Sequence, residues 1–373
     1  MRGVRDGQDA ERDLGVCHGY YRGMYGATKI AENYRQLTLM LEIARDMERL
    51  CPDAWLIQSS NPVYEGTTLI HRETRIRMIG LCHGYAGYKE IAEVIGLEPE
   101  RISFAAPGIN HCLWMTRFEY DGQDAYPLLD AWIADKSAAY WRGWQPRFNE
   151  TQTAPAAIDQ YRLVGLMPLG DTARTFTEWQ YHLDLPTMQR WYGPLGGFDA
   201  EIGWQHYLQR LSGKVEHVWH AVADPAARLT DLFPSAKTIE QQVPIIDALT
   251  NGNHGVFQVN WPNNGAIAGI ADDVAVETAA EIGSGGVRLL PVGTLPRQLM
   301  LHMLLPRVLD MERTLEAFAT GDRRVLESIL LWDHRTRTPE AGQAYLDALL
   351  DQPINREMRE RFARSTPALA LHE

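Results

Sequence analysis

The chain has 373 residues, a formal net charge of −12 and 45% apolar residues, the composition of a globular protein long enough for two domains. No Lys- or Arg-rich block occurs, so binding to nucleic acid is not expected. No apolar run approaches the length of a membrane span and the first residues are charged, so we expect no membrane partner and a cytoplasmic location.

The cysteine count argues against a disulfide framework. The four cysteines are irregularly spaced, and four are too few to cross-link a chain of this length: Cys17, Cys51, Cys82 and Cys112. We expect reduced thiols. Cys51 and Cys112 lie beside apolar segments, which is typical of inert buried thiols.

The first third of the chain alternates between helical and strand-like patterns. Residues 1–15 are polar and are expected to form a loop, whereas the apolar residues of 27–50 recur at spacings of three, four and seven, which predicts an amphipathic helix. Further on we expect buried strands at 54–60 and 76–82, helices at 67–71 and 88–95, and another strand at 102–105. This alternation is typical of βαβ units, so the sequence predicts an α/β fold that begins with a partial, Rossmann-like parallel sheet.

The pattern changes near Gly108, and we place a domain boundary there, giving domains of residues 1–108 and 109–373. The second domain is predicted to be α+β. We expect a helix at 127–144, a loop at 151–157, strands at 255–261 and 273–282 joined through the turn Asn263-Asn264-Gly265, a long helix over 299–330 broken near Gly321, and a helix at 339–351.

Cys82 and His111 are the first candidate functional residues. Cys82 ends a predicted strand and His111 follows the turn Gly108-Ile109-Asn110, so both side chains could face one cleft. A thiolate and an imidazole suit a borderline divalent metal and would leave positions open for substrate oxygens. A buried thiol and a hydrogen-bonded histidine are the alternative.

Gly170-Asp171-Thr172-Ala173-Arg174 offers a carboxylate and a guanidinium at helical spacing. One interpretation is a helix N-cap with a solvated arginine. The other is a general base beside a cation that binds substrate. No Gly-x-Ser-x-Gly elbow and no Walker loop occurs in the sequence, which argues against two common classes of enzyme.

Eight short motifs, taken in order, resemble the family 4 glycoside hydrolases, and the likeness extends over nearly the whole chain. They are Cys-Pro-Asp-Ala-Trp (51–55), Ser-Asn-Pro (60–62), Gly-Leu-Cys-His-Gly (80–84), Gly-Ile-Asn-His (108–111), Gly-Asp-Thr-Ala-Arg (170–174), Arg-Trp-Tyr-Gly (190–193), Val-Asn-Trp-Pro-Asn-Asn-Gly (259–265) and Thr-Gly-Asp (320–322). The resemblance implies a partial Rossmann-like domain followed by an α+β domain like the C-terminal one of lactate and malate dehydrogenases. It also implies two cofactors, NAD and Mn²⁺ or another divalent metal.

The mechanism implied by the resemblance is a redox-assisted elimination. NAD takes a hydride from sugar C3, the ketone acidifies the proton at C2, a base removes that proton, and the aglycone leaves from C1. Water then adds and the hydride returns.

By position in these motifs, Cys82 and His111 would hold the metal, and Asp171 would be the base at C2. Arg174, Asn61 and Asn110 would bind the substrate, and His83 would assist proton transfer near the leaving group. The resemblance leaves the residues that bind NAD unknown.

The residues after the metal-binding cysteine suggest the substrate. His83-Gly84 at this place resembles the α-glucuronidase and α-galacturonidase branch of the family, so the substrate is expected to be a small uronide. A uronate carboxylate needs a cationic or amide-rich partner, for which Arg174 is one candidate. We also expect a homo-oligomer, either a dimer or a tetramer.

The sequence departs from the family at its start. Family members begin with a glycine-rich strand-to-helix turn that holds the NAD diphosphate, and nothing like it occurs here, because Gly283-Ser284-Gly285-Gly286 lies in a predicted β region. We therefore expect the chain to begin after the first two or three βαβ units, about 60 to 100 residues. Either the true start lies upstream of Met1 or this is a shortened relative, catalytically inactive and kept as a sugar-binding or oligomerisation module. A dehydrogenase of the lactate or malate type ranks last, because its His-Asp pair and arginine loop are not found.

Overall fold

The computed structural model describes residues 29–144, 152–175, 180–233, 238–332, 336 and 338–363. An eight-stranded sheet has the order β1-β2-β9-β10-β4-β5-β8, with β11 paired to β10. Its strands are β1 (Trp55–Gln58), β2 (Arg77–Gly80), β4 (Gly108–Ile109), β5 (Cys112–Met115), β8 (Met167–Leu169), β9 (Gly255–Pro262), β10 (Ala275–Gly283) and β11 (Gly286–Leu289). β1 and β2 run parallel, and the other pairs are antiparallel. The expected α/β fold with a partial parallel sheet is confirmed.

The first βαβ unit follows the predicted pattern. Helix α2 (Lys29–Leu50) matches the expected amphipathic helix, and α3 (Val63–Glu73) connects β1 to β2. The side chains of β1 are half-buried rather than fully buried as expected, because β1 is the outermost strand of the described sheet.

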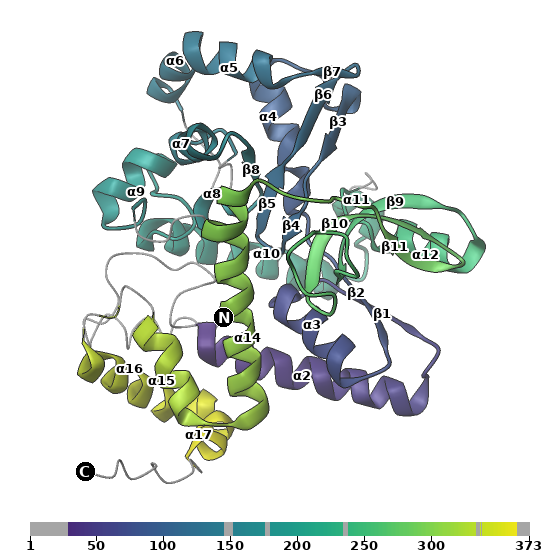
Figure 1. The fold of residues 1–373 in the computed structure, drawn as a ribbon, viewed down its shortest axis with the longest axis vertical. Helices are drawn as coiled ribbons and strands as arrows, with labels where there is room; N and C mark the ends of the chain where they lie inside the picture. Colours follow the sequence, from purple (N-terminus) through teal and green to yellow (C-terminus); the bar gives the residue numbers. More distant parts are fainter. Residues whose placement is uncertain are drawn as a thin grey trace.

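Helices cover both faces of the sheet. Successive side chains of a strand point to opposite faces. Met78 of β2 therefore packs in the cluster that contains α2 and α3, whereas Ile79 packs with Ile245 and Ala248 of α12 (Gln242–Asn251). In Figure 1, α2 and α3 lie below the sheet and α12 lies beside β9 and β11.

One strand belongs to a different sheet from the one expected. β3 (Ile102–Ala105) does not extend the parallel pair but forms a separate antiparallel sheet with β6 (Arg117–Tyr120) and β7 (Gln123–Asp124). Phe104 is paired with Phe118 across it. An apolar run of four residues fits either a parallel or an antiparallel strand, so the local pattern could not decide the partner.

The remaining helices form two groups, of which the C-terminal one lies apart from the small sheet (Figure 1). Next to the small sheet lie α4 (Gly87–Ile95), α5 (Tyr126–Asp135) and α6 (Ser137–Arg142). α4 ends at Ile95, where the end of a helix was expected, and Gly96 after it is left-handed. Then follow α7 (Pro155–Val164), α8 (Thr172–Thr175), α9 (Leu185–Tyr192), α10 (Glu201–Ala223) and α11 (Leu229–Leu232).

The C-terminal helices match the expected long broken helix and its successor. They are α13 (Arg297–Leu299), the π-helical turn η3 (Met300–Leu304), α14 (Leu305–Thr320), α15 (Arg323–Trp332), α16 (Pro339–Asp351) and α17 (Arg356–Phe362). Gly321, at φ 66°, ends α14 where the break was expected. The described residues also contain short 3₁₀ turns, which are η1 (Gly84–Ala86), η2 (Pro99–Arg101) and η4 (Pro353–Asn355).

The domain boundary expected near Gly108 stays a prediction. The large sheet takes strands from both sides of this residue. Residues 1–15 and Cys17 lie outside the described residues. The loop expected at 151–157 ends earlier, since Pro155 opens α7. Cys112 is buried as expected, but the expectation for Cys51 is wrong: it is exposed just after α2 ends.

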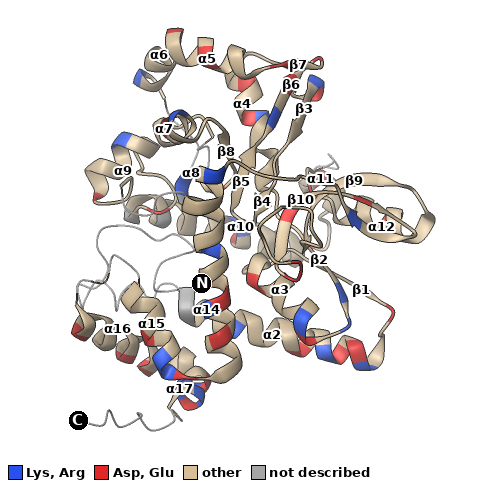
Figure 2. Cartoon of the chain, in the orientation of Figure 1, with Lys and Arg blue, Asp and Glu red and all other residues tan. Residues whose placement is uncertain are grey.

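Two surface expectations can be compared with the fold. No helix of the described ranges is both long and apolar enough to cross a bilayer. Figure 2 shows acidic and basic residues interspersed along α2, α14, α15 and α17, whereas the charged residues of α16 are acidic. Along these described helices the basic residues do not form a continuous positive stripe.

Gly80 tests the packing of β2 against α3 and β9. A Cβ there would lie 2.4 Å from Oγ1 of Thr67 and 2.8 Å from Cγ1 of Val63. We expect Gly80→Ala to lower the free energy of unfolding by about 1–3 kcal/mol, as overpacking does. Urea denaturation would measure this. Gly143→Ala is the control, because nothing lies within 4 Å of its added Cβ; equal effects of the two substitutions would contradict the packing.

Candidate active site

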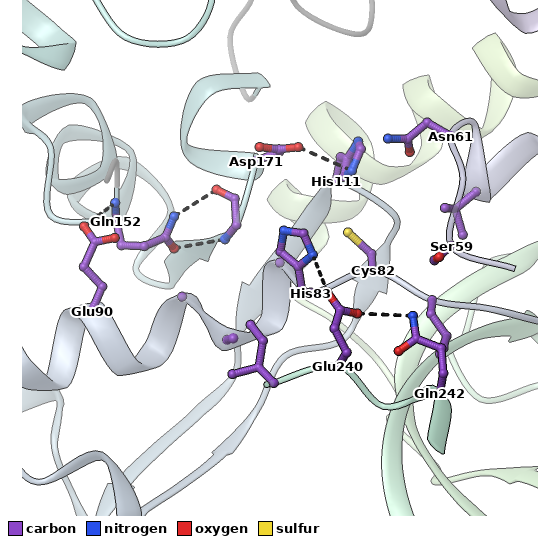
Figure 3. Close-up of a pocket in the computed structure, with 17 residues that line it drawn as sticks. Ser59, Asn61, Cys82, His83, Glu90, His111, Gln152, Asp171, Glu240 and Gln242 are labelled. Carbon is purple, nitrogen blue, oxygen red and sulfur yellow. Dashed lines mark hydrogen bonds and ion pairs between the residues drawn. The ribbon is translucent and has the colours of Figure 1, made fainter. Parts of the chain in front are cut away.

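A cavity of about 440 Å³ opens at the carboxyl ends of β1 and β2, where ligands bind in open α/β sheets. Five of the seven predicted site residues line it: Asn61, Cys82, His83, His111 and Asp171. The other lining residues are Ser59, Val63, Leu81, Gly84, Ala86, Gly87, Glu90, Gln152, Gly170, Ile239, Glu240 and Gln242. Asn110 and Arg174 are buried and are not among the lining residues. Figure 3 shows the cavity.

Cys82 lies two residues beyond β2. Its sulfur accepts hydrogen bonds from the backbone N–H of Gly84 and the side-chain amide of Asn110. Burial, with the negative charges of Glu277 and Asp171, raises the pKa of the Cys82 thiol to about 12. Without a cation the group is therefore a thiol, and a bound divalent ion would favour the thiolate.

His111 occupies a strained turn. Asn110 and His111 form the two-residue connection between β4 and β5, where Ile109 pairs with Cys112. The φ of His111 is 59°, a left-handed conformation that a non-glycine residue adopts only when its surroundings hold it. Arg307 of α14 contributes, because its guanidinium donates to the carbonyls of Asn110 (3.0 Å) and His111 (3.2 Å).

Gly170 and Asp171 connect β8, which ends at Leu169, to α8, which begins at Thr172. The carboxylate of Asp171 accepts from Nε of Arg174 (2.9 Å) and lies 3.3 Å from Nε2 of His111. Burial raises the pKa of Asp171, but the positive charge of Arg174 and the neighbouring His111 outweigh it and hold this pKa well below its usual range. Asp171 is therefore ionised at neutral pH.

Arg174 is engaged by two carboxylates. Its NH1 donates to both oxygens of Asp199 (2.7 and 2.9 Å), while its Nε bonds to Asp171. The guanidinium lies 4.7 Å from the ring centre of Phe198. Arg174 thus lies behind Asp171 and keeps it charged, instead of lining the cavity as a substrate-binding group would.

His83 lies at the open side of the cavity and its side chain is exposed. Nδ1 lies 3.5 Å from the carboxylate of Glu240, and Gln242 donates to the same side chain at 3.3 Å (Figure 3). The hydroxyl of Tyr85 donates to the carbonyl of Ile239 at 2.9 Å. The segment containing Glu240 is thereby attached to the loop after Cys82.

Asn61 follows β1, and the Asn61-Pro62 peptide is cis. Pro62 precedes the first residue of α3, so this peptide forms the corner between strand and helix. The side chain of Asn61 lines the cavity on the side opposite Asp171 (Figure 3).

A fully buried carboxylate lies behind Cys82. Glu277 of β10 accepts from the amides of Asn110 (2.8 Å) and Asn260 (3.1 Å) through the same oxygen, Oε2. Burial raises the pKa of Glu277 from its ordinary 4.5 to about 7, although these two hydrogen bonds lower it. Through Asn110, Glu277 is connected to the sulfur of Cys82.

Sequence patterns did not reveal several residues of the site. Gln152, Glu90, Glu240, Gln242 and Arg307 belong to no motif that suggests chemistry. Their positions depend on long-range contacts, such as the 62 residues between Gln152 and Glu90. The expected turn Gly108-Ile109-Asn110 pointed only to His111, and it is corrected by the structure, in which Gly108 and Ile109 form β4.

The donor set suits one divalent cation with two protein ligands. Within the part of the chain that the structure describes, no group of three or more His, Cys, Asp and Glu side chains could hold a metal. Cys82 and His111 nevertheless line the same cavity, and two ligands leave positions for substrate oxygens. The residues present therefore fit a catalytic ion, while a closed structural site is not formed by these residues.

Comparison with known proteins agrees with this geometry. The model of the family 4 glycosyl hydrolase C-terminal domain matches residues 106–336, more than half of the chain. The chain belongs to glycosyl hydrolase family 4. A second model, for the family 4 glycosyl hydrolases, matches residues 1–97.

Curated relatives within family 4 have several specificities. The chain is 26% identical to an alpha-galactosidase of Bacillus subtilis over 74% of this chain and 59% of the relative. It is 24% identical to an alpha-galacturonidase of Thermoanaerobacter italicus over 80% of this chain and 66% of the relative. The chain therefore spans less than two thirds of the length of these two relatives.

The fold is also that of solved family 4 structures. A 6-phospho-alpha-glucosidase from gut microorganisms, crystallised in complex with NAD and Mn²⁺, superposes with a TM-score of 0.71 at 20% identity, covering 96% of this chain and 80% of that one. At this identity the likeness establishes the fold and leaves the specificity open.

The pKa of Glu277 leads to a prediction for the metal-free protein. A folded-state pKa near 7 means that the folded protein binds more protons than the unfolded chain between about pH 4.5 and pH 7, so stability from this group is lost as the pH rises through that window. The free energy of unfolding of Glu277→Gln, relative to that of wild type, should rise by on the order of 3 kcal/mol from pH 5 to pH 8. Urea denaturation at both values would measure it, and a difference independent of pH would contradict the shift.

Proposed function

We propose that this chain forms the metal- and sugar-binding part of an α-glycosidase that depends on a divalent cation, Mn²⁺, and on NAD. The main support is that Cys82, His111 and Asp171, which are far apart in the sequence, line one cavity. The Mn²⁺ and NAD in the complex of the structural neighbour agree with the proposed cofactors.

Cys82 and His111 would hold the cation. A bound divalent ion polarises sugar oxygens and stabilises negative charge that develops on them. Asn110 contributes from behind, because its amide donates to the sulfur of Cys82 and to Glu277. Second-sphere contacts of this kind orient a metal ligand.

Asp171 would accept the proton from C2 of the sugar. Arg174 and His111 keep its carboxylate ionised, the form that can take a proton. Asn61, on the other side of the cavity, would hydrogen-bond to sugar hydroxyls. His83, supported by Glu240 at the open side, would give a proton to the leaving oxygen.

The described residues offer candidate groups for the metal and the sugar, whereas a site for the dinucleotide is not found among them. They contain no Gly-x-Gly-x-x-Gly turn between a strand and a helix, the structure that holds a dinucleotide diphosphate. The binding of NAD to this chain therefore needs a direct test.

The sugar would be a uronide, an α-D-glucuronide or α-D-galacturonide. Support comes from Cys82-His83-Gly84 and from similarity to several alpha-galacturonidases, including that of Thermoanaerobacter italicus. Of the two histidines that line the cavity, His111 is the proposed metal ligand, so His83 would be the basic side chain available to a uronate carboxylate.

A neutral α-galactoside is the second candidate. Among the described lining residues there is no Lys or Arg, while Glu90, Asp171 and Glu240 are acidic, so a neutral sugar would meet less repulsion than a uronate. The 26% identity to an alpha-galactosidase agrees with this alternative.

A substrate panel would decide between the candidates. The purified protein, with Mn²⁺, NAD and a thiol reductant, is assayed with 4-nitrophenyl α-D-galacturonide, α-D-glucuronide and α-D-galactoside. We expect the highest kcat/KM for a uronide, and calorimetry should show saturable NAD binding. Turnover of the galactoside alone would favour the second candidate. No turnover together with no NAD binding would favour a catalytically inactive relative.

Replacing Asp171 tests the proposed base. Asp171→Asn should lower kcat by about 10²- to 10⁴-fold, the usual contribution of general acid–base catalysis. Asp121→Asn is the control, because Asp121 is exposed and ion-paired with Arg101 outside the cavity. A kcat within twofold of wild type for Asp171→Asn would exclude this role.

Replacing Cys82 tests the metal site apart from catalysis. Cys82→Ser should weaken Mn²⁺ binding at least tenfold, because an alcohol is a poorer ligand than a thiolate at neutral pH. Electron paramagnetic resonance of free Mn²⁺ would measure the affinity. Cys51→Ser makes the same change at an exposed thiol and should leave it unaltered; equal affinities for all three proteins would remove Cys82 from the metal site.

A further inference from the structure

The peptide before Asp171 is held by one buried amide side chain. Nε2 of Gln152 donates to the carbonyl of Gly170 (3.0 Å), and the N–H of Gly170 donates to Oε1 of Gln152 (2.9 Å). Gln152 is only 4% exposed. Figure 3 shows this pair of hydrogen bonds beside Asp171. Both polar groups of Gly170 are thus bound by one side chain.

Gln152 is itself fixed by α4. Its backbone N–H donates to Oε1 of Glu90 at 3.1 Å. A Cβ on Gly87, the first residue of α4, would lie 2.2 Å from Oε1 and 2.6 Å from Cδ of Gln152. The side-chain amide of Gln152 therefore occupies space that a side chain at position 87 would fill.

Gly170 also contacts the loop that carries Cys82 and His83. A Cβ on Gly170 would lie 2.5 Å from Cα and 2.9 Å from the carbonyl oxygen of Gly84, and the φ of Gly170 is 59°. The loop with the proposed base and the loop with the proposed metal ligand thus meet backbone to backbone. A small shift of the Gly170 peptide would move Asp171 relative to Cys82.

We propose that Gln152 is a positioning residue for the catalytic base: by binding both groups of the Gly170 peptide, it sets the place of the Asp171 carboxylate. This inference rests on the proposed function of Asp171. Its expected size follows from geometry, because a displacement of about 1 Å at a reacting group can cost about 10²-fold in rate.

Two substitutions should remove the same contact by different means. Gln152→Ala deletes the amide, whereas Gly87→Ala displaces it with a methyl group while its helical backbone (φ −54°, ψ −23°) accepts alanine. Each should lower kcat about 10- to 100-fold with KM within about threefold of wild type. In the double variant the losses should not multiply, because the second change finds the contact already absent.

Two readouts separate positioning from a general loss of structure. With the aryl α-glycoside that the wild-type protein cleaves, deuterated at C2, the primary isotope effect on kcat should rise in both single variants, because a misplaced base slows proton removal. Hydrogen exchange of the peptide that contains the Gly170 amide should accelerate in both. Mn²⁺ affinity should stay within twofold of wild type.

Gln241 offers a matched control. Its side chain makes the same two hydrogen bonds to one residue, Gln258: Nε2 donates to the carbonyl (2.8 Å) and Oε1 accepts from the N–H (3.0 Å). Gln241→Ala removes an equal pair of contacts without touching Gly170. It should leave the isotope effect and the exchange of the Gly170 amide unchanged.

The proposal is overturned if Gln152→Ala loses no more kcat than Gln241→Ala, if the isotope effect does not rise, or if the losses of Gly87→Ala and Gln152→Ala multiply. If the wild-type protein cleaves no α-glycoside, the proposed function fails. Hydrogen exchange of the Gly170 amide then decides alone. Faster exchange in both variants supports the proposal that Gln152 holds the Gly170 peptide, and unchanged exchange rejects it.

Discussion

The candidate site depends on one buried carboxylate and on the row of residues across the sheet to which it belongs. Glu277 is paired with Asn260 on one side and with Gly108 on the other, and Asn260 is paired with Gly80. A charge in this place is costly unless hydrogen bonds surround it, and the amides of Asn260 and Asn110 supply them. Asn110 also hydrogen-bonds to the sulfur of Cys82. The same side chain therefore stabilises Glu277 and orients the proposed metal ligand. The same row explains the two glycines at its ends: a Cβ on Gly80 would enter α3, and one on Gly108 would lie 2.0 Å from the carbonyl oxygen of Cys112.

Around this row, the site is assembled from loops whose backbones touch. The Cys82 loop and the Gly170 loop meet at Gly84 and Gly170, and the His111 turn is held from the other side by Arg307 of α14. Three segments distant in sequence thus place a thiol, an imidazole and a carboxylate around one cavity without a dedicated cluster of ligands. Such an arrangement would leave a bound cation dependent on substrate oxygens, as a catalytic ion requires.

The electrostatics of the site divide its carboxylates by environment. Asp171, beside Arg174 and His111, has its pKa held low, whereas Glu277, surrounded by neutral amides, has its pKa raised to about 7. Burial acts on both groups in the same direction, so the difference comes from the charged partner that Asp171 has and Glu277 lacks. The separation agrees with different tasks, an ionised group for proton transfer and a buried one that orients neighbours.

The sequence by itself determined the first βαβ unit, the hairpin of β9 and β10, the C-terminal helices and the family, because these follow from local periodicity, turn residues and ordered motifs. It also named Cys82, His111 and Asp171. It could not place β3 in its separate sheet, since strand partners are chosen by long-range packing rather than by the strand's own residues. It assigned Arg174 to the substrate, whereas the fold directs that guanidinium to Asp171 and Asp199. Gln152, Glu240 and Glu277 carry no local signal, because their roles arise only when segments up to 167 residues apart are brought into contact. Motifs therefore named the candidate reacting groups, and tertiary structure alone decided what holds them in place.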